Sequence, residues 1–286
     1  LFFRPTENKY EGEGILPHGT FNNTNDWNPL IKYLEKGAIE FPDKTMFKMG
    51  DGNGKIIEEF TYKETNQKSN QIANYLIENC SINSEDKIGI FMLNSSEFVF
   101  SILATHKTGA IQVPVNKDEK GERLLYVINY SEMKVLIIDK SAIDLIEPIA
   151  DKFENLERIF ISGSEGNIPS NLGNIDCEEF ESFNKGSINN PNIELTIANK
   201  ERCMFTSGTT GMPKGVVREH GGVLMTVRSY IQHQGIRSDD TLMSVLSLGH
   251  ANAQAMCLFA AIGAGCTAVF FPKFSASNFW KWAHDC

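Results

Sequence analysis

The feature that most constrains the fold is an alternation of strand-like and helix-like segments between residues 87 and 161. Short apolar runs alternate with longer segments whose apolar residues recur every three or four positions. The strand-like runs cover residues 87–93, 111–114, 135–138 and 158–161, and the helix-like segments cover residues 95–108, 117–130 and 142–153. This order is typical of βαβ units, which build a mostly parallel sheet with helices on its faces. The sequence therefore predicts an α/β fold.

The residues before this alternation predict a lead-in and a first group of elements. Residues 1–26 show no period and are rich in Gly, Asn, Thr and Pro, which favours an extended segment. A helix is expected over 29–41 and a hairpin over 45–60. Thr61 and Glu64 then have the spacing of a capping box, so a further helix should begin there.

A boundary between two stacked βαβ subdomains is expected in the middle of the chain. Residues 163–199 are rich in Gly, Asn, Pro and Ser and indicate a linker, with one short helix near residues 177–183. We expect a first subdomain over 27–185 and a second over 200–286. The chain begins without Met, and we expect the second subdomain to be incomplete at its C-terminus, as in a fragment.

Charge excludes several kinds of partner. The chain of 286 residues carries a net charge of −9, which argues against nucleic acid or an anionic membrane. Residues 200–286 are nevertheless mildly basic, with a net charge of +3. A bound anion would therefore be better accommodated in this last third than elsewhere.

The cysteines and histidines show no metal or disulfide pattern. No two of the six cysteines lie closer than nine residues, which favours reduced intracellular thiols. The six histidines form no HExxH motif. No basic region followed by an apolar stretch marks a signal peptide, so we expect a cytoplasmic protein.

One apolar stretch must be compared with a membrane span. Residues 241–272 contain no charged side chain, and residues 253–271 are long enough to cross a bilayer. Polar residues at its start and Gly263 and Gly265 in its middle favour a buried helix, a glycine turn and a buried strand over 266–271. No membrane span is therefore expected.

A loop of Thr, Ser and Gly between two β-like runs is the strongest candidate site. Its candidate phosphate-binding residues are Thr206, Ser207, Gly208, Thr209, Thr210, Gly211 and Lys214. Glycine lets backbone N–H groups point at an anion, hydroxyl groups add donors, and the lysine adds a positive charge. The pattern is neither Walker A nor GxGxxG. Taken alone, it leaves a flexible connection between two strands as the alternative.

The exact string over 206–215 resembles the motif Thr-Ser-Gly-Thr-Thr-Gly-x-Pro-Lys-Gly of the adenylate-forming (AMP-binding) superfamily. Weaker blocks of this superfamily follow the expected order at residues 60–64, 107–116 and 214–220. The superfamily includes acyl-CoA synthetases, amino-acid adenylation domains and luciferases, and the sequence looks most like acyl-CoA ligases of the crotonobetaine/carnitine type. The resemblance begins near residue 27 and covers about the first half of a family member.

This resemblance implies an enzyme that activates a small carboxylic acid. Family members attach AMP from ATP to the carboxylate and release pyrophosphate, and a thiol, usually that of coenzyme A, then displaces AMP. By resemblance, residues 206–214 hold the β- and γ-phosphates of ATP, and Thr206 is the expected ligand of Mg²⁺. Catalysis would then depend on positioning and on charge stabilisation.

His250 is the candidate catalytic residue. The family has a Pro-x-Phe-His block at this distance beyond the loop, with the histidine beside the reacting carboxylate. Here the block is Ser247-Leu248-Gly249-His250, so both Pro and Phe are replaced, and Gly249 removes an aromatic wall from the expected acyl pocket. A structural histidine in an apolar segment is the alternative. His220 is expected to be structural.

The family's later motifs, for ribose, for metal and for the catalytic lysine, do not occur within the 286 residues. The resemblance therefore implies that this chain alone completes no active site and binds ATP weakly or not at all. A non-catalytic half-domain is an alternative to the acid–CoA ligase, as are amino-acid adenylation and luciferase-like chemistry. The sequence leaves the acid, the thiol acceptor and assembly into a homo-oligomer open.

Overall fold

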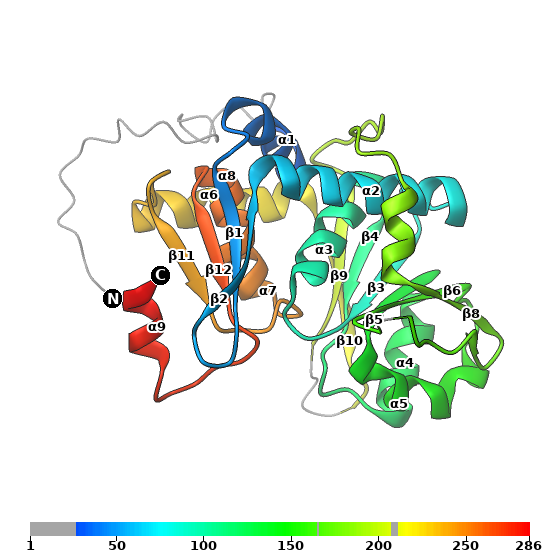
Figure 1. Ribbon diagram of the computed structural model, residues 1–286. Coiled ribbons are helices and arrows are strands. Elements are labelled where there is room, and N and C mark those ends of the chain that lie inside the picture. The colour runs from blue at the N-terminus through cyan, green and yellow to red at the C-terminus, as the bar shows by residue number, and fades with distance from the viewer. Residues whose placement is uncertain (1–26, 165, 207–210) are drawn as a thin grey trace.

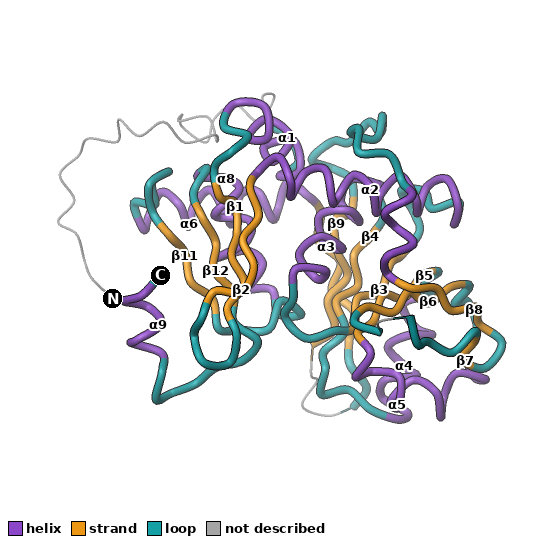
Figure 2. Tube along the Cα trace, in the orientation of Figure 1, coloured by secondary structure: helices purple, strands orange, loops and turns teal. Residues whose placement is uncertain are grey.

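The computed structural model describes residues 27–164, 166–206 and 211–286. Within these residues the strands form an eight-stranded sheet in the order β10-β9-β4-β3-β5-β6-β8-β7 and a four-stranded sheet in the order β11-β12-β1-β2. Figures 1 and 2 show the two sheets side by side, with helices packed on both.

The eight-stranded sheet is formed from the middle of the chain. Its strands are β3 (Lys87–Phe91), β4 (Ile111–Pro114), β5 (Val135–Asp139), β6 (Arg158–Ser162), β7 (Asn171–Leu172), β8 (Ile175–Glu179), β9 (Lys200–Thr206) and β10 (Lys214–Glu219). The helices that accompany it are α2 (Tyr62–Cys80), α3 (Ser96–Thr108), α4 (Gly121–Ser131), η2 (Lys140–Ala142), α5 (Ile143–Ile146), η3 (Glu147–Lys152) and η4 (Phe180–Lys185).

The four-stranded sheet combines the two ends of the described chain. Its strands are β1 (Thr45–Gly50), β2 (Ile56–Thr61), β11 (Thr241–Ser244) and β12 (Thr267–Phe270). The remaining helices are α1 (Leu30–Glu40), α6 (His220–Gln234), α7 (Ala251–Ala253), η5 (Gln254–Leu258), α8 (Phe259–Ala264) and α9 (Phe279–Asp285).

Strand direction confirms the α/β class predicted from the alternating pattern. Strands β3, β4, β5, β6, β8 and β9 pair in parallel, and only the edge strands β7 and β10 of the described part of this sheet are antiparallel to their neighbours. In the smaller sheet, β12 is parallel to both β1 and β11, whereas β1 and β2 form the expected hairpin.

The strands do not divide between the sheets at the boundary expected from the sequence. Strands β9 and β10, expected in a second subdomain over 200–286, belong to the same sheet as β3–β8. Strands β1 and β2, expected in a first subdomain over 27–185, pair instead with β12, where Phe47 lies opposite Ala268. The reason is that parallel pairing joins segments far apart in sequence, which a local change in composition does not reveal.

Two local predictions also need correction. The helix expected over 142–153 is broken into η2, the single-turn α5 and η3, because Pro148 cannot continue an α-helix beyond its first turn. The linker over 163–199 contains β8, which pairs with β6, so the short helix expected at 177–183 begins only at Phe180.

The predicted helix ends are confirmed where capping chemistry marks them. Thr61 Oγ1 accepts a hydrogen bond from the Glu64 backbone N–H, and the Glu64 carboxylate accepts one from the Thr61 N–H, which completes the capping box of α2. Gly109 ends α3 at φ 77°, in the left-handed region that favours glycine.

The core forms two main clusters, one on each face of the eight-stranded sheet. Alternate residues of a strand face opposite sides. Val135 and Ile137 therefore join the cluster that includes α1, α2, α3, α6, α8 and the inner face of the smaller sheet, whereas Leu136 and Ile138 join the cluster with α4. The second face of the smaller sheet packs against α9, where Trp282 stacks on Phe271 at 4.4 Å.

The uncharged stretch over 241–272 forms β11, the helical segments α7, η5 and α8, and β12, close to the expected helix, glycine turn and strand. Gly265 ends α8 at φ 69°. Among the described residues, none of the helices combines the length and hydrophobicity needed to span a membrane.

Candidate active site

The candidate phosphate loop connects two antiparallel strands. Thr206 is the last residue of β9 and lies opposite Lys214, the first residue of β10. Both residues are exposed, and the Thr206 hydroxyl makes only a long contact, 3.5 Å, to the Lys214 carbonyl oxygen. Gly211 is also exposed, with open space around its Cα. Ser207, Gly208, Thr209 and Thr210 lie outside the described residues.

Strand β10 has an unusual environment for part of a sheet. All six of its residues are exposed, including Val216 and Val217. None of the residues that the structure describes forms an ion pair with the Lys214 ammonium group. This lysine therefore extends from the sheet edge into solvent, directly beside Thr206.

His250 lies on the loop between β11 and α7. The side chain is exposed and caps α7, since its Nδ1 accepts a hydrogen bond from the Asn252 backbone N–H at 3.2 Å. Its own backbone N–H donates to the Ser247 carbonyl oxygen at 2.9 Å. The imidazole is thus exposed to solvent, and its Nδ1 also has a structural role as the cap of α7.

The His250 loop, residues 245–250, lies at the same edge of the larger sheet as the end of β9. Strands β4 and β9 are parallel neighbours, with Gln112 opposite Arg202, so their carboxyl ends meet at one edge. Gly249 lies against the end of β4, because a Cβ on this residue would be 3.5 Å from the Val115 carbonyl oxygen. The structure thus brings the His250 loop and Thr206 to one edge of the sheet, with no direct hydrogen bond between them among the described residues.

Asn94 is a buried residue of this region that sequence reasoning missed. It lies in the loop after β3. Its side-chain amide bonds this loop to the loops that follow β11 and β12. Its Nδ2 donates to the carbonyl oxygens of Leu246 and Phe271, both at 2.9 Å, and its Oδ1 accepts from the Leu248 N–H at 2.7 Å. A polar residue at the end of the apolar run over 88–93 was the available signal.

Sequence reasoning also missed a buried network on β9. Arg202 Nη1 donates to Gln254 Oε1 at 2.7 Å, and Arg202 Nε lies 2.9 Å from the Glu201 carboxylate. Glu201 is 1% exposed and also lies 2.9 Å from His106 Nε2. Burial alone would raise the pKa of Glu201, but the neighbouring Arg202 and His106 outweigh it and the pKa is lowered. Charged residues leading directly into the apolar run Cys203-Met204-Phe205 of a strand were the signal.

His220 has the structural environment expected from the sequence. It is buried at the start of α6, and its ring meets the His106 ring edge-on at 5.5 Å. Burial, with a further contribution from His106, lowers the pKa of His220 to about 4. The imidazole is therefore neutral at physiological pH.

Metal binding by several side chains has no support in this region. Across residues 27–164, 166–206 and 211–286, no three His, Cys, Asp or Glu side chains are grouped so as to hold a metal ion. The six cysteines all lie within these ranges and are free thiols.

The fold and this loop define a family. Residues 34–286 match the family model described as AMP-binding enzyme, and the chain belongs to that family. Among curated relatives, it is 27% identical over 256 residues to a crotonobetaine/carnitine–CoA ligase of Proteus mirabilis, covering 89% of this chain and 47% of the relative. It is 30% identical over 248 residues to the medium/long-chain-fatty-acid–CoA ligase FadD6 of Mycobacterium tuberculosis, covering 85% of this chain and 38% of the relative.

Solved structures show the same fold. The anthranilate CoA ligase AuaEII in complex with anthranoyl-AMP superposes with a TM-score of 0.78 at 23% identity, over 90% of this chain and 48% of that one. The N-terminal domain of FACL13 from Mycobacterium tuberculosis superposes with a TM-score of 0.76 at 23% identity, over 91% of this chain and 61% of that one. The chain spans about half the length of the curated relatives it matches.

Proposed function

We propose that this chain is the N-terminal part of an ATP-dependent carboxylic acid–CoA ligase. The observation that carries the proposal is the complete ten-residue motif over 206–215 on the β9–β10 hairpin, within a chain that matches the AMP-binding enzyme family. In the first step, a carboxylate oxygen attacks the α-phosphorus of ATP, so that acyl-adenylate forms and pyrophosphate leaves. In the second step, the thiolate of coenzyme A attacks the acyl carbon, so that a thioester forms and AMP leaves.

The described residues of the loop fit a polyphosphate. Lys214 is exposed and has no ion-pair partner among the described residues, so its charge is free to meet the β- and γ-phosphates. The Thr206 hydroxyl is exposed and only weakly bonded, which suits a ligand of Mg²⁺. The magnesium ion would neutralise phosphate charge. Ser207, Gly208, Thr209, Thr210 and Gly211 complete the proposed phosphate site.

His250 is proposed to lie beside the reacting carboxylate. Its exposure and its place at the carboxyl edge of β4, near the end of β9, support this role. Gly249 in front of it leaves the neighbouring wall of the acyl site open. A small carboxylic acid is the proposed substrate, in line with the crotonobetaine/carnitine ligases among the relatives, and we propose a cytoplasmic location.

The test uses the complete reading frame, obtained by sequencing the message past the codon for Cys286. The purified protein is incubated with ATP, Mg²⁺, coenzyme A and a panel of acids that includes crotonobetaine, carnitine, fatty acids and amino acids. We expect acid-dependent release of pyrophosphate, and release of AMP that requires coenzyme A. Pyrophosphate released with amino acids alone would favour amino-acid adenylation, and light emission with a luciferin would favour luciferase-like chemistry. No release with any acid would favour the non-catalytic half-domain.

A pair of lysine variants links the activity to the loop. Lys214→Met should lower the adenylation rate by about 100-fold, because a positive charge at the transferred phosphates is lost. Lys200→Met is the matched control, since Lys200 begins the same hairpin but pairs with Glu85 at 3.2 Å. Equal rates in the two variants would contradict the proposed phosphate site.

A further inference from the structure

The position of His250 depends on a backbone group two residues before it. Leu248 is fully buried, although the residues around it are exposed or partly exposed. Its N–H donates to Asn94 Oδ1 at 2.7 Å, and its carbonyl oxygen accepts from Gln254 Nε2 at 2.7 Å. The backbone N–H and C=O of Leu248 are therefore both held by buried side chains.

Asn94 connects this point to both sheets. It lies three residues beyond the end of β3 of the larger sheet, and its Nδ2 donates to Leu246 on the loop after β11 and to Phe271 after β12. A primary amide can donate twice and accept at the same time, which neither a hydroxyl nor a carboxylate can do. Asn94 thus makes two hydrogen bonds to the His250 loop, at Leu246 and Leu248, and a third to Phe271.

Gln254 connects the same point to the strand that leads into the phosphate loop. It is fully buried, and its Oε1 accepts the 2.7 Å hydrogen bond from Arg202 of β9. Arg202 is itself held by Glu201 and lies over the Phe259 ring at 5.5 Å. Thr206 follows four residues later on the same strand. A continuous path of hydrogen bonds therefore joins the His250 loop to β9.

We propose that Asn94, Gln254 and Arg202 are positioning residues for His250, and we call them the Leu248 clamp. The clamp fixes His250 relative to the end of β9 and so relative to the phosphates bound there; this inference rests on the proposed function. Reactions that depend on orientation lose about 100-fold in rate when a group moves by roughly 1 Å. A released loop would therefore slow the adenylation step while the phosphate loop itself still binds ATP.

Two asparagine variants test the clamp in the protein of the complete reading frame. Asn94→Ala removes the two donors and the acceptor. Asn74→Ala is the matched control, because Asn74 Nδ2 also donates to two backbone carbonyl oxygens, of Ser187 at 2.7 Å and Asn189 at 2.8 Å, but on the outer side of α2. The measurements are kcat and KM for ATP in pyrophosphate release, and amide hydrogen exchange of residues 245–254.

We expect Asn94→Ala to lower kcat about 10- to 100-fold with less than a threefold change in KM for ATP, and to speed exchange in the His250 loop about tenfold or more. Asn74→Ala should leave kcat within about twofold. Equal losses of kcat in the two variants, or a parallel rise in KM for ATP, would overturn the clamp. Should Asn94→Ala fail to fold, Gln254→Met and Asn94→Asp carry the same expectation, since each removes a donor to this loop.

The two proposals fail in different ways. A wild-type protein that releases no pyrophosphate with any acid would overturn the proposed function, and with it the catalytic purpose of the clamp. An active wild-type protein whose Asn94→Ala variant keeps its kcat would overturn the clamp alone.

Discussion

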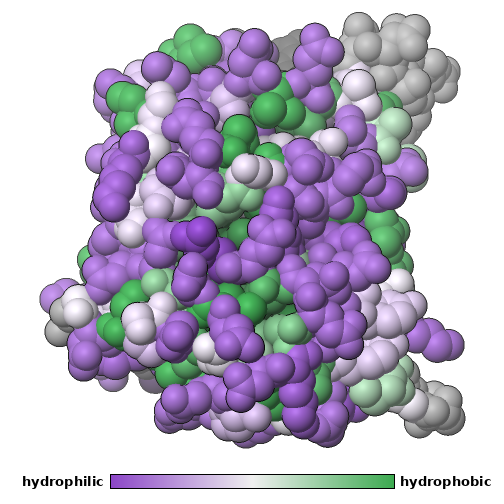
Figure 3. Space-filling model, turned by 90° about the vertical axis from the view of Figure 1, so that its right-hand side faces the viewer, coloured by the Kyte–Doolittle hydropathy of each residue, from purple (hydrophilic) through white to green (hydrophobic). Residues whose placement is uncertain are grey.

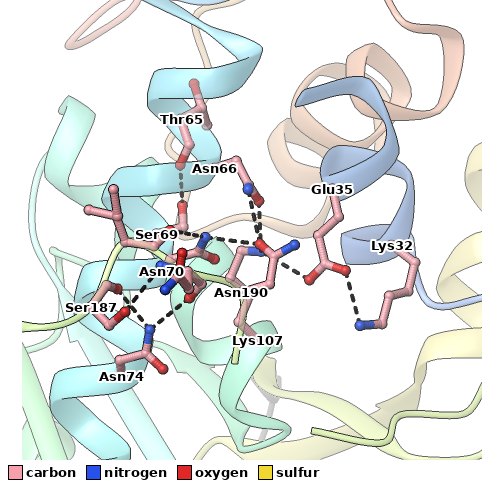
Figure 4. Close-up of polar contacts among 12 residues, drawn as sticks. Lys32, Glu35, Thr65, Asn66, Ser69, Asn70, Asn74, Lys107, Ser187 and Asn190 are labelled. Carbon is pink, nitrogen blue, oxygen red and sulfur yellow. Dashed lines mark hydrogen bonds and ion pairs between the residues drawn. The ribbon is translucent and has the colours of Figure 1, made fainter. Parts of the chain in front are cut away.

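Lys107 and Glu201 are both buried charges, but their surroundings differ. Lys107 donates to Glu35 at 3.1 Å, Asn66 at 2.8 Å and Asn190 at 3.4 Å (Figure 4), and these four residues form the Lys107 cluster. Each proton of the ammonium group thus has an acceptor. Glu35 is 14% exposed and also pairs with Lys32 at 3.0 Å.

The Glu201 cluster consists of Glu201, Arg202, His106, Gln254 and His220, and every one of these side chains is buried. Gln112 of β4 lies opposite Arg202 of β9. The side-chain amide of Gln112 is buried and has no hydrogen-bond partner among the described residues. One member of the Lys107 cluster is therefore open to solvent, whereas every side chain of the Glu201 cluster is buried.

The two clusters differ in their distance from the candidate site. The Lys107 cluster joins α1, α2 and α3 to the chain segment after η4, away from the carboxyl edge of the strands. The Glu201 cluster lies on β9, the strand that ends at the candidate phosphate loop, and reaches the His250 loop through Gln254. Breaking the first should loosen the fold locally, and breaking the second should cost more stability and disturb the site.

Glu201→Gln is expected to have the largest effect on stability. It leaves the Arg202 guanidinium buried without its anion, and removal of one partner from a buried pair costs about 3–5 kcal/mol. Glu35→Gln is the matched control and should cost less, because Lys107 keeps two amide acceptors and Glu35 is partly hydrated. Urea unfolding of this chain measures both, and equal losses would remove the proposed difference between the clusters.

His220 should make the Glu201 cluster sensitive to acid. Its native pKa of about 4 lies below its ordinary value of 6.5, so between these pH values the unfolded chain binds more protons than the native chain. Stability should therefore fall as pH drops from 6.5 to 4, by about 3 kcal/mol from this group. The His220→Gln variant should lack this part of the decline, as followed by urea unfolding across the range. Parallel pH profiles of the two proteins would disprove the effect.

Lys107 should make the folding stability depend on pH in the alkaline range. Burial lowers the pKa of Lys107 from 10.5 to about 8, against the opposing effect of Glu35. Above pH 8 the native lysine loses its proton while the unfolded lysine keeps it, so stability should rise with pH. The gain relative to Lys107→Met should reach about 2 kcal/mol between pH 8 and 9.5. A wild-type stability that falls relative to the variant over this range would contradict the lowered pKa.

The sequence predicted the elements of the fold better than their assembly. The four strands expected between residues 87 and 161, the hairpin over 45–60 and the capping box at Thr61 follow from local chemistry, and each is confirmed, whereas β7 and β8 lie in a segment expected to be a linker. Sheet membership does not, because β1 pairs with a strand more than 200 residues later, with Phe47 opposite Ala268. For that reason, the strands of the two sheets do not separate at the boundary expected between residues 185 and 200.

The candidate site was predictable only where a linear motif marks it. The loop over 206–215 is recognisable as a string, and His250 by its distance from that string. Asn94, Arg202 and Gln254 come from three segments and meet only in the folded chain. Charged residues within a strand suggest an exposed face, so the burial of Glu201 and Arg202 is set by non-local packing and not by the strand itself.

Three asparagines of α2 lie beside the Lys107 cluster. Replacing one of them should change the free energy of unfolding least of all the variants and should change amide exchange only locally. Asn66, Asn70 and Asn74 recur every four residues on one face of α2, and their amides donate to residues 187–190 (Figure 4). Asn70 and Asn74 donate to backbone carbonyl oxygens, and Asn66 donates to the Asn190 side chain, in a segment whose composition predicts only a linker. Figure 3 shows the molecule from the right-hand side of Figure 1, where the surface is largely polar with scattered apolar side chains.

Asn74→Ala should lower the free energy of unfolding by only about 1–2 kcal/mol, because it removes two hydrogen bonds at the rim of the structure. It should nevertheless speed amide exchange in residues 184–190 while the exchange of residues 200–206 stays unchanged, since β9 is held by other contacts. Asn79→Ala is a suitable control, because Asn79 lies on the same helix and donates only to the Tyr75 carbonyl oxygen. If faster exchange spread from residues 184–190 into β9, the two clusters would belong to one cooperative unit. The proposed contrast, in which the Lys107 cluster acts locally and the Glu201 cluster affects the candidate site, would then be wrong.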